Sequence, residues 1–151
     1  MNCKLFESHG GALTKDLFMR FAHPYLKEIR DTVKSRLDQL GYRIPMTVFG
    51  KDCHYAMQEI CDIGYDVVGL DWSNDPRQVR RLNPTVTLQG NLDPCALYSS
   101  PEQLRALTAD MIKQFGTRRY IANLGHGIYP DMDPAHVAVF IDAVHAYKAD
   151  Q

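Results

Sequence analysis

Five short apolar segments alternate with segments of helical periodicity along this chain, and the alternation restricts the fold more than any other feature. Within the apolar segments, hydrophobic residues do not alternate cleanly with polar ones, as is typical of parallel strands buried on both faces. A regular succession of strand and helix favours an α/β fold with a parallel sheet. The predicted strands are residues 4–8, 45–50, 66–72, 85–91 and 119–125.

The segments between the predicted strands have the start and stop signals of helices. In the clearest one, Ser100 occupies the N-cap position, Pro101 follows it, and Gln103 stands where it completes a capping box. Gly116 ends this helix, because glycine favours the position just after the last turn. Its predicted buried stripe is Leu104, Leu107, Met111 and Phe115, and further helices are predicted over residues 26–40, 55–64 and 75–83 and from Asp133 onward.

Chain length bounds the number of domains, and net charge bounds the classes of molecule that the protein binds. With 151 residues, the chain is long enough to bury a core, and we predict one domain over residues 1–151. A net charge of −1 and a pI of about 6.6 give no electrostatic case for binding nucleic acid or an anionic membrane. We predict that Arg80-Arg81 and Arg118-Arg119 are isolated, solvated pairs. No apolar run approaches the roughly 18 residues of a membrane span.

The chain holds four cysteines without any CxxC spacing: Cys3, Cys53, Cys61 and Cys95. A chain of this size builds a core without disulfides, so we interpret the cysteines as reduced thiols and predict a cytoplasmic location, with no signal-peptide pattern at the N-terminus. A zinc site from Cys53 and His54 is disfavoured, because adjacent residues rarely both reach one metal and no second ligand pair follows. We therefore predict no metal site.

Polar residues stand at the carboxyl ends of the predicted strands. In parallel α/β folds these ends meet on one side of the sheet, where ligands bind. Their coincidence predicts a binding site, although Asp71 taken alone is also explained as a cap, and Asn91 and Asp93 as turn residues. The strand ends are Ser8-His9, Lys51-Asp52-Cys53-His54, Asp71-Trp72, Gln89-Gly90-Asn91 and Gly125-His126-Gly127.

His126 is the most distinctive of these residues, since it stands between two glycines in a strand-to-helix loop. Gly125 and Gly127 are expected to allow backbone conformations closed to other residues and to let a ligand approach closely. We therefore predict a functional role for His126 rather than that of an ordinary surface histidine. An open flavodoxin-type sheet also satisfies the strand pattern, but no glycine-rich phosphate loop follows the first strand.

Several long motifs resemble the uroporphyrinogen decarboxylase family, and together they cover essentially the whole chain. They are "LFESHGG", "PMTVFGKDCHYAMQEICDIGYDVVGLDW", "VTLQGNLDPCALYSS" and "RYIANLGHGIYPDMDPAHVAVFIDAVH". The family fold is a single (β/α)₈ barrel, and the resemblance matches its C-terminal part. It thus implies a partial TIM barrel, in which the predicted strands are the last five of the eight and the N-terminal barrel strands are absent.

The resemblance implies a carboxy-lyase of haem biosynthesis that works without a cofactor. Its reaction converts the four acetate side chains of uroporphyrinogen III to methyl groups and gives coproporphyrinogen III. A protonated pyrrole carbon serves as the electron sink, so the site has to bind a polyanionic macrocycle and deliver protons. The family is homodimeric, which implies a homodimer of full-length chains.

Two site residues follow from the resemblance, and three more from position at a strand end. Ser8 matches a substrate-contacting serine, and His126 matches the substrate-contacting histidine, which as a cation pairs with a carboxylate of the substrate. We therefore predict His126 as the catalytic residue as well as a substrate-binding one. Lys51, Asp71 and Asn91 are added as substrate-binding candidates from strand-end position alone. The family's Met-Arg-Gln-Ala-Gly-Arg motif, its pyrrole-binding aspartate and its active-site tyrosine have no match here. We therefore expect little or no decarboxylase activity from the 151 residues alone.

Three other interpretations stay open. The sequence is a piece of a normal decarboxylase, or it is a truncated, non-catalytic product that associates with the full-length enzyme. The third is a zinc- and corrinoid-linked methyltransferase relative, a class that binds zinc through a His-x-Cys pair and a later cysteine. Here the corresponding stretch reads "KDCHY", which has the wrong order and spacing, and His126 stands where the late cysteine is wanted.

Overall fold

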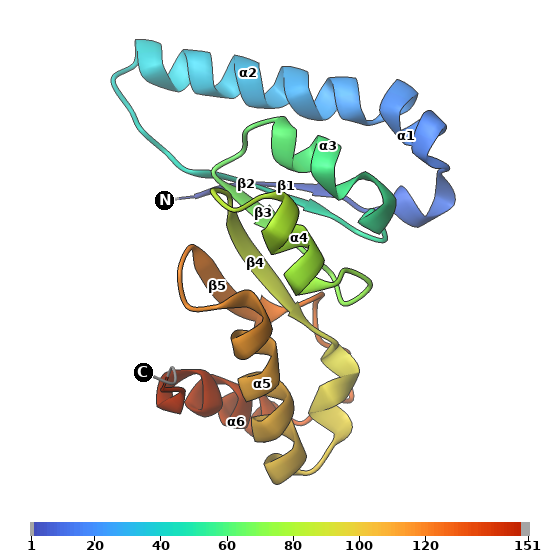
Figure 1. The fold of residues 1–151 in the computed structure, drawn as a ribbon. Helices are drawn as coiled ribbons and strands as arrows, with labels where there is room; N and C mark the ends of the chain where they lie inside the picture. The colour runs from blue at the N-terminus through green and yellow to red at the C-terminus, as the bar shows by residue number, and fades with distance from the viewer. Residues whose placement is uncertain (1, 149–151) are drawn as a thin grey trace.

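The computed structural model describes residues 2–148 and contains one parallel sheet of five strands in chain order, β1-β2-β3-β4-β5. All neighbouring strands pair in parallel (Figure 1), so the predicted α/β class is confirmed. The strands are β1 (Cys3–Glu7), β2 (Met46–Gly50), β3 (Val67–Gly69), β4 (Thr87–Leu92) and β5 (Tyr120–Leu124).

A helix or helical turn follows each strand, as parallel pairing requires. Figure 1 shows α2 above the strands, α3 and α4 in front of them, and α5 and α6 below. Within residues 2–148 no helix is long and apolar enough to cross a membrane. The α-helices are α1 (Lys15–Phe21), α2 (His23–Gln39), α3 (Met57–Asp62), α4 (Pro76–Leu82), α5 (Pro101–Phe115) and α6 (Pro134–Ala146), and the 3₁₀ turns are η1 (Gly10–Ala12), η2 (His54–Ala56) and η3 (Pro94–Tyr98).

Side-chain caps begin the helices where the sequence predicts them. The Ser100 hydroxyl accepts a hydrogen bond from the Gln103 backbone N–H, and the Gln103 side-chain oxygen accepts one from the Ser100 backbone N–H. The predicted capping box of α5 is therefore confirmed. The side chains of Asp75 and Asp133 accept from backbone N–H groups in the first turns of α4 and α6. The predicted buried stripe of α5 is wrong at Leu107, which is 45% exposed. Buried Thr108 takes that place, because its hydroxyl donates to a carbonyl of the preceding turn.

The hydrophobic core lies between the helices and the sheet. Its strand residues include Val48, Val68 and Leu88, which are fully buried in the middle of neighbouring strands. The prediction that the strands are buried on both faces holds for β2 and β3 and is wrong for β1 and β5. Exposed and half-buried residues alternate along β1 and β5, because successive side chains point to opposite faces and the face toward the cavity is open at these two strands.

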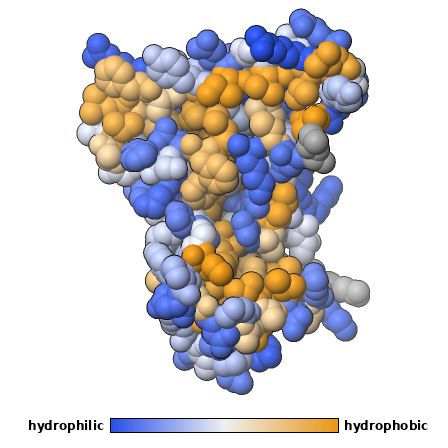
Figure 2. Space-filling view, turned by 180° about the vertical axis from the view of Figure 1, so that it is seen from behind, coloured by the Kyte–Doolittle hydropathy of each residue, from blue (hydrophilic) through white to orange (hydrophobic). Residues whose placement is uncertain are grey.

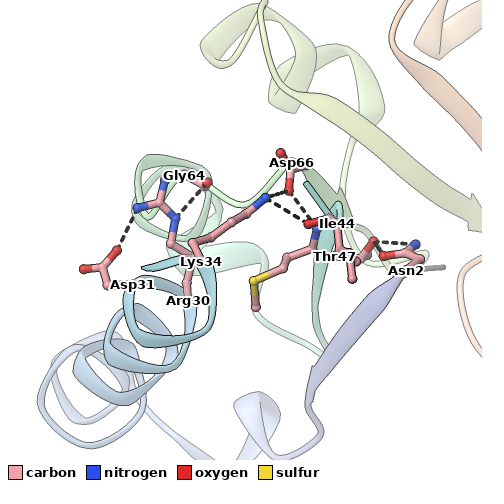
Figure 3. Close-up of polar contacts among 9 residues, drawn as sticks. Asn2, Arg30, Asp31, Lys34, Ile44, Thr47, Gly64 and Asp66 are labelled. Carbon is pink, nitrogen blue, oxygen red and sulfur yellow. Dashed lines mark hydrogen bonds and ion pairs between the residues drawn. The ribbon is translucent and has the colours of Figure 1, made fainter. Parts of the chain in front are cut away.

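Polar contacts fix α2 to the amino-terminal ends of β2 and β3 (Figure 3). Lys34 Nζ lies 2.5 Å from Asp66 Oδ2 and donates to the carbonyl of Ile44 at 3.2 Å. Asp66 also accepts from the backbone N–H of Met46 at 2.7 Å. Burial raises the pKa of Asp66, but the hydrogen bonds from Lys34 and Met46 outweigh it and hold the pKa below its usual value. One carboxylate thereby joins a helix to two strands.

Candidate functional site

A cavity of about 430 Å³ extends along one face of the sheet to the carboxyl ends of the strands. Figure 2 shows the molecule from the side opposite to Figure 1, with apolar and polar side chains mixed across this side. Three of the five predicted site residues line this cavity: Ser8, Lys51 and His126. The other lining residues are Lys4, Leu5, Phe6, Thr47, Phe49, Gly69, Leu70, Gln89, Asn123, Leu124, Gly125 and Gly127.

Aromatic side chains hold the ring of His126. Its centroid lies 6.5 Å from that of Phe49 and 6.2 Å from that of Trp72, and the Trp72 contact is edge-to-face at 85°. Within residues 2–148 the ring nitrogens make one long polar contact, 3.4 Å from Nδ1 to the carbonyl of Gly127. The imidazole is exposed and lies against two aromatic rings, and its nitrogens retain hydrogen-bonding capacity for a ligand.

The two glycines beside His126 both line the cavity but differ in their surroundings. Neither has a positive φ, so the expectation of a backbone conformation closed to other residues is wrong. At Gly125 an added Cβ lies 2.8 Å from the backbone nitrogen of Trp72 and 3.1 Å from the carbonyl oxygen of Asn91. At Gly127 no atom lies within 4 Å of an added Cβ. Gly125 therefore permits close packing under the histidine, and Gly127 leaves space beside it.

Asp71 lies behind the cavity wall rather than in it. The side chain is fully buried, and its carboxylate accepts four hydrogen bonds. Oδ2 accepts from the backbone N–H of Asp52, and Oδ1 accepts from the N–H and hydroxyl of Ser73 and from the side chain of Asn74. The structure gives Asp71 a positioning role, since it joins the loops that follow β2 and β3.

Asn91 extends this buried joint to β4. Its side-chain nitrogen donates to the carbonyl of Asp71 and to that of Asn74, each at 2.9 Å. Its own carbonyl oxygen lies against Gly125, as the close approach there shows. Asn91 borders a neighbouring hollow with Trp72 rather than the main cavity. Direct contact of Asp71 or Asn91 with a substrate stays a prediction, while their hydrogen bonds link the loops after β2 and β3 to strand β4.

Lys51 stands on a turn that Asp71 fixes. The next residue, Asp52, has a φ of 55°, a left-handed conformation that is uncommon for a non-glycine residue. The Asp52 N–H that donates to buried Asp71 keeps this backbone in place. The Lys51 ammonium lies 3.2 Å from the Asp52 carboxylate and lines the cavity. This pair is partly exposed, so solvent weakens it and the lysine stays available to a ligand anion.

Ser8 is placed by the turn that follows it. An added Cβ at Gly10 lies 2.1 Å from the Cys53 sulfur and 2.5 Å from the Lys51 carbonyl oxygen, so η1 packs directly on the end of β2. The Tyr55 hydroxyl donates to the carbonyl of Gly10 at 2.7 Å and fixes the same turn. Burial raises the pKa of the Cys53 thiol to about 12, which keeps this cysteine protonated and structural.

Sequence reasoning missed part of the cavity wall. Lys4, Phe6, Thr47, Phe49 and Asn123 all line it. The signal that identifies them is a period of two. In β1, Lys4 and Phe6 face the cavity, as does Ser8 just after the strand, and pairing places Lys4 beside Thr47 and Phe6 beside Phe49. The strand-end prediction covered only residues at the carboxyl end of each strand, so it did not include cavity-lining residues within the strands.

The cavity combines cationic and aromatic side chains. Lys4, Lys51 and His126 provide positive charge or hydrogen-bond donors, and Phe6 and Phe49 provide apolar surface, with their ring centroids 6.0 Å apart. This arrangement suits a flat apolar ligand that carries carboxylates. Within residues 2–148 no group of three or more His, Cys, Asp or Glu side chains is arranged to hold a metal ion.

Comparison with known proteins gives a consistent family. The family model "Uroporphyrinogen decarboxylase (URO-D)" matches residues 2–147. The uroporphyrinogen decarboxylases of Homo sapiens and Pongo abelii are each 53% identical over 147 residues, which cover 96% of this chain and 40% of theirs. That of Schizosaccharomyces pombe is 43% identical over 149 residues, 95% of this chain and 42% of its own. The chain therefore spans about 40% of the length of these relatives.

A solved structure supports the fold. A methyltransferase from Methanosarcina mazei superposes with a TM-score of 0.75 and 14% sequence identity, covering 93% of this chain and 40% of that chain. At this identity the likeness is one of fold alone. The superposed part is likewise a minor share of the larger protein, as a partial barrel requires.

Proposed function

The chain belongs to the uroporphyrinogen decarboxylase family, and on that premise we propose that it supplies one wall of a site that decarboxylates uroporphyrinogen. The observation that carries the proposal is the single cavity that contains Ser8, Lys51 and His126. In this proposal residues 1–151 are the C-terminal part of the family's barrel domain. The proposed location is cytoplasmic, in keeping with four cysteines in a chain that needs no disulfide.

The cavity suits the recognition steps of this reaction. The substrate is a macrocycle with acetate and propionate carboxylates, so its binding requires donors at the rim and apolar contact for the rings. Ser8 and His126 are assigned to carboxylates of the substrate, and Lys51 adds a positive charge on the same wall. Phe6 and Phe49 are assigned to the ring faces, because both expose aromatic surface to the cavity.

The proposed chemistry needs no electron acceptor beyond the substrate itself. A proton adds to a pyrrole carbon, the bond between the acetate methylene and its carboxylate breaks, and the electron pair moves into the protonated ring. CO₂ leaves, a proton adds to the methylene carbon to give the methyl group, and the ring proton is lost. Each cycle therefore consumes one proton and releases one CO₂. His126 is assigned to hold a carboxylate during this sequence by a charge-assisted hydrogen bond.

A chimera tests the proposal. The chimera joins residues 2–147 of this chain to the part of the Homo sapiens enzyme that they do not match, in place of the human segment. We expect the chimera to form coproporphyrinogen and the 151-residue chain alone to form little or none. A folded chimera without turnover contradicts the assigned function, and normal turnover by the chain alone contradicts the expected need for the remaining strands.

Variants of the chimera separate binding from folding. His126→Asn removes one charge-assisted hydrogen bond, which corresponds to a loss of about 10- to 100-fold in kcat/KM. His145→Asn is the matched control, because His145 is exposed in the last turn of α6. Ser35→Ala, at an exposed position on α2, is the matched control for Ser8→Ala. Equal losses in test and control variants contradict the assignment.

The open sheet edges favour association as a second candidate function. In the described part of the chain β1 and β5 each pair with one neighbour, so each leaves one backbone edge of the sheet unpaired. In this proposal the chain associates with a full-length decarboxylase, and full-length chains form a homodimer. Co-purification with tagged Homo sapiens enzyme supports the association, while elution at the mass of a separate monomer contradicts it.

A further inference from the structure

Three arginines from two distant segments of the chain meet in a hollow at the other end of the sheet. The hollow has a volume of about 490 Å³ and lies at the amino-terminal side of β4 and β5. Arg80 comes from α4, and Arg118 and Arg119 come from the turn before β5. The prediction of isolated arginine pairs is therefore wrong for these residues. The remaining lining residues are Pro84, Phe115, Gly116 and Thr117, so among residues 2–148 no carboxylate lines the hollow.

Arg80 is fixed in place by backbone carbonyls rather than by an acidic partner. Its guanidinium donates to Val86 at 2.7 Å, to Arg119 at 2.8 Å and to Arg118 at 3.4 Å. These bonds orient the group but do not neutralise its charge. Burial and then the positive charge of Arg119 lower the pKa of Arg80, as expected where cations lie together without a counter-charge.

Arg118 and Arg119 retain donors for a ligand. Arg119 donates to the carbonyl of Thr85 at 2.8 Å through Nη1, which leaves its other N–H groups. Within residues 2–148 the Arg118 guanidinium makes neither an ion pair nor a hydrogen bond. Both side chains are exposed, so a ligand in solution reaches them directly.

The turn itself adds backbone donors. Gly116 and Arg119 have φ values of 73° and 51°, so left-handed residues bracket Thr117 and Arg118. In the described part of the chain, the N–H groups of Thr117 and Arg118 donate to no backbone carbonyl. Adjacent free N–H groups in a tight turn favour anions. Side-chain forks and backbone donors are thus available in one place.

We propose that this arginine hollow binds a small oxyanion of the phosphate class. Three guanidinium groups line the hollow, and no carboxylate of the described residues 2–148 does, so its charge matches that of a phosphate; the fork of Arg118 matches the phosphate oxygens. The whole chain has a net charge of −1, so the attraction is local rather than general. The hollow lies at the opposite ends of the strands from His126, so its ligand is distinct from the proposed decarboxylase substrate.

Calorimetric titration of the full chain with inorganic phosphate tests this proposal, at an ionic strength held constant with sodium chloride. We expect saturable binding in the millimolar range or tighter, weakened at least about tenfold by Arg118→Gln and by Arg119→Gln. Arg77→Gln removes the same charge from an exposed position on α4 and is expected to leave binding unchanged. Because Arg118 is exposed, its replacement is not expected to affect folding, and circular dichroism of each variant checks this.

Two further titrations distinguish this site from the decarboxylase site and an organic phosphate from the free anion. His126→Asn is expected to retain phosphate binding, which separates this site from the proposed decarboxylase site. A phosphate monoester, phenyl phosphate, binds more tightly than inorganic phosphate if the natural ligand is organic, and equally if it is the free anion. The proposal is overturned if no saturable binding occurs, if Arg118→Gln binds phosphate as the unchanged chain does, or if Arg77→Gln weakens binding equally.

Discussion

Replacing Asp71 by asparagine removes one acceptor from the buried joint behind the cavity. The amide is best accommodated with its nitrogen in the place of Oδ2, because Oδ2 accepts one hydrogen bond and Oδ1 accepts three. The variant then loses the hydrogen bond from the Asp52 N–H, and this N–H faces the N–H donors of the new amide. We expect Asp71→Asn to destabilise the fold and the turn that presents Lys51.

The magnitude follows from the contacts. Loss of one hydrogen bond to a charged group costs about 1.5–3 kcal/mol, and a buried donor left without a partner costs about 1–3 kcal/mol. The neutral amide offsets part of this, because burying a charge is costly in itself. We therefore expect the free energy of unfolding to fall by about 2–3 kcal/mol for Asp71→Asn.

Urea unfolding measures this loss with two probes. Trp72 is the single tryptophan of the chain and follows Asp71 directly, so its fluorescence reports the joint, while far-ultraviolet circular dichroism reports the whole fold. The matched control is Asp142→Asn on the exposed side of α6, which is expected to change stability by no more than about 0.5 kcal/mol. If Asp71→Asn is as mild as this control, the carboxylate does not support the joint.

Three further predictions concern packing, thiols and pH. Gly125→Ala forces a Cβ within 2.8 Å of a backbone nitrogen, so thermal unfolding should show a loss of about 1–3 kcal/mol; an unchanged midpoint contradicts the close packing. With dithionitrobenzoate at pH 8, exposed Cys95 is expected to react in the native state and buried Cys53, whose pKa is raised to about 12, only after unfolding. Because the pKa of Asp66 is lowered in the native state, its carboxylate stabilises the fold at pH values above the pKa of Asp66 in the unfolded chain. This stabilisation is lost as the pH falls through the native pKa of Asp66. Asp66→Asn should therefore cost about 1 kcal/mol or less at pH 7 and nothing in acid, and a difference that persists in acid contradicts the ion pair with Lys34.

The predictable part of the fold rests on local signals. Apolar runs and caps such as Ser100 lie close in sequence to the structure that they determine, so four of the five predicted strands agree with the observed ones to within two residues. The third strand ends early, at Gly69 rather than at Trp72, because the Asp71 carboxylate turns the chain toward Ser73. Leu107 could not be placed from periodicity alone, since Thr108 satisfies its own hydroxyl within the helix and is buried in its stead.

The predictable part of the site rests on topology. Parallel strands bring their carboxyl ends together, and this rule places Ser8, Lys51 and His126 in one cavity. The rule does not distinguish a residue that faces the cavity from one that holds the loops behind it. Asp71 and Asn91 are of the second kind, because their hydrogen bonds to other loops appear only once the strands are in register.

The central claim is that this cavity holds the carboxylates of a porphyrinogen. A crystal structure of the chimera with coproporphyrinogen bound is the most direct measurement of it. The account predicts a carboxylate oxygen within about 2.7–3.2 Å of a His126 ring nitrogen and of the Ser8 hydroxyl, with Phe6 and Phe49 against the rings. A macrocycle bound elsewhere, with His126 and Ser8 in contact with solvent alone, contradicts it.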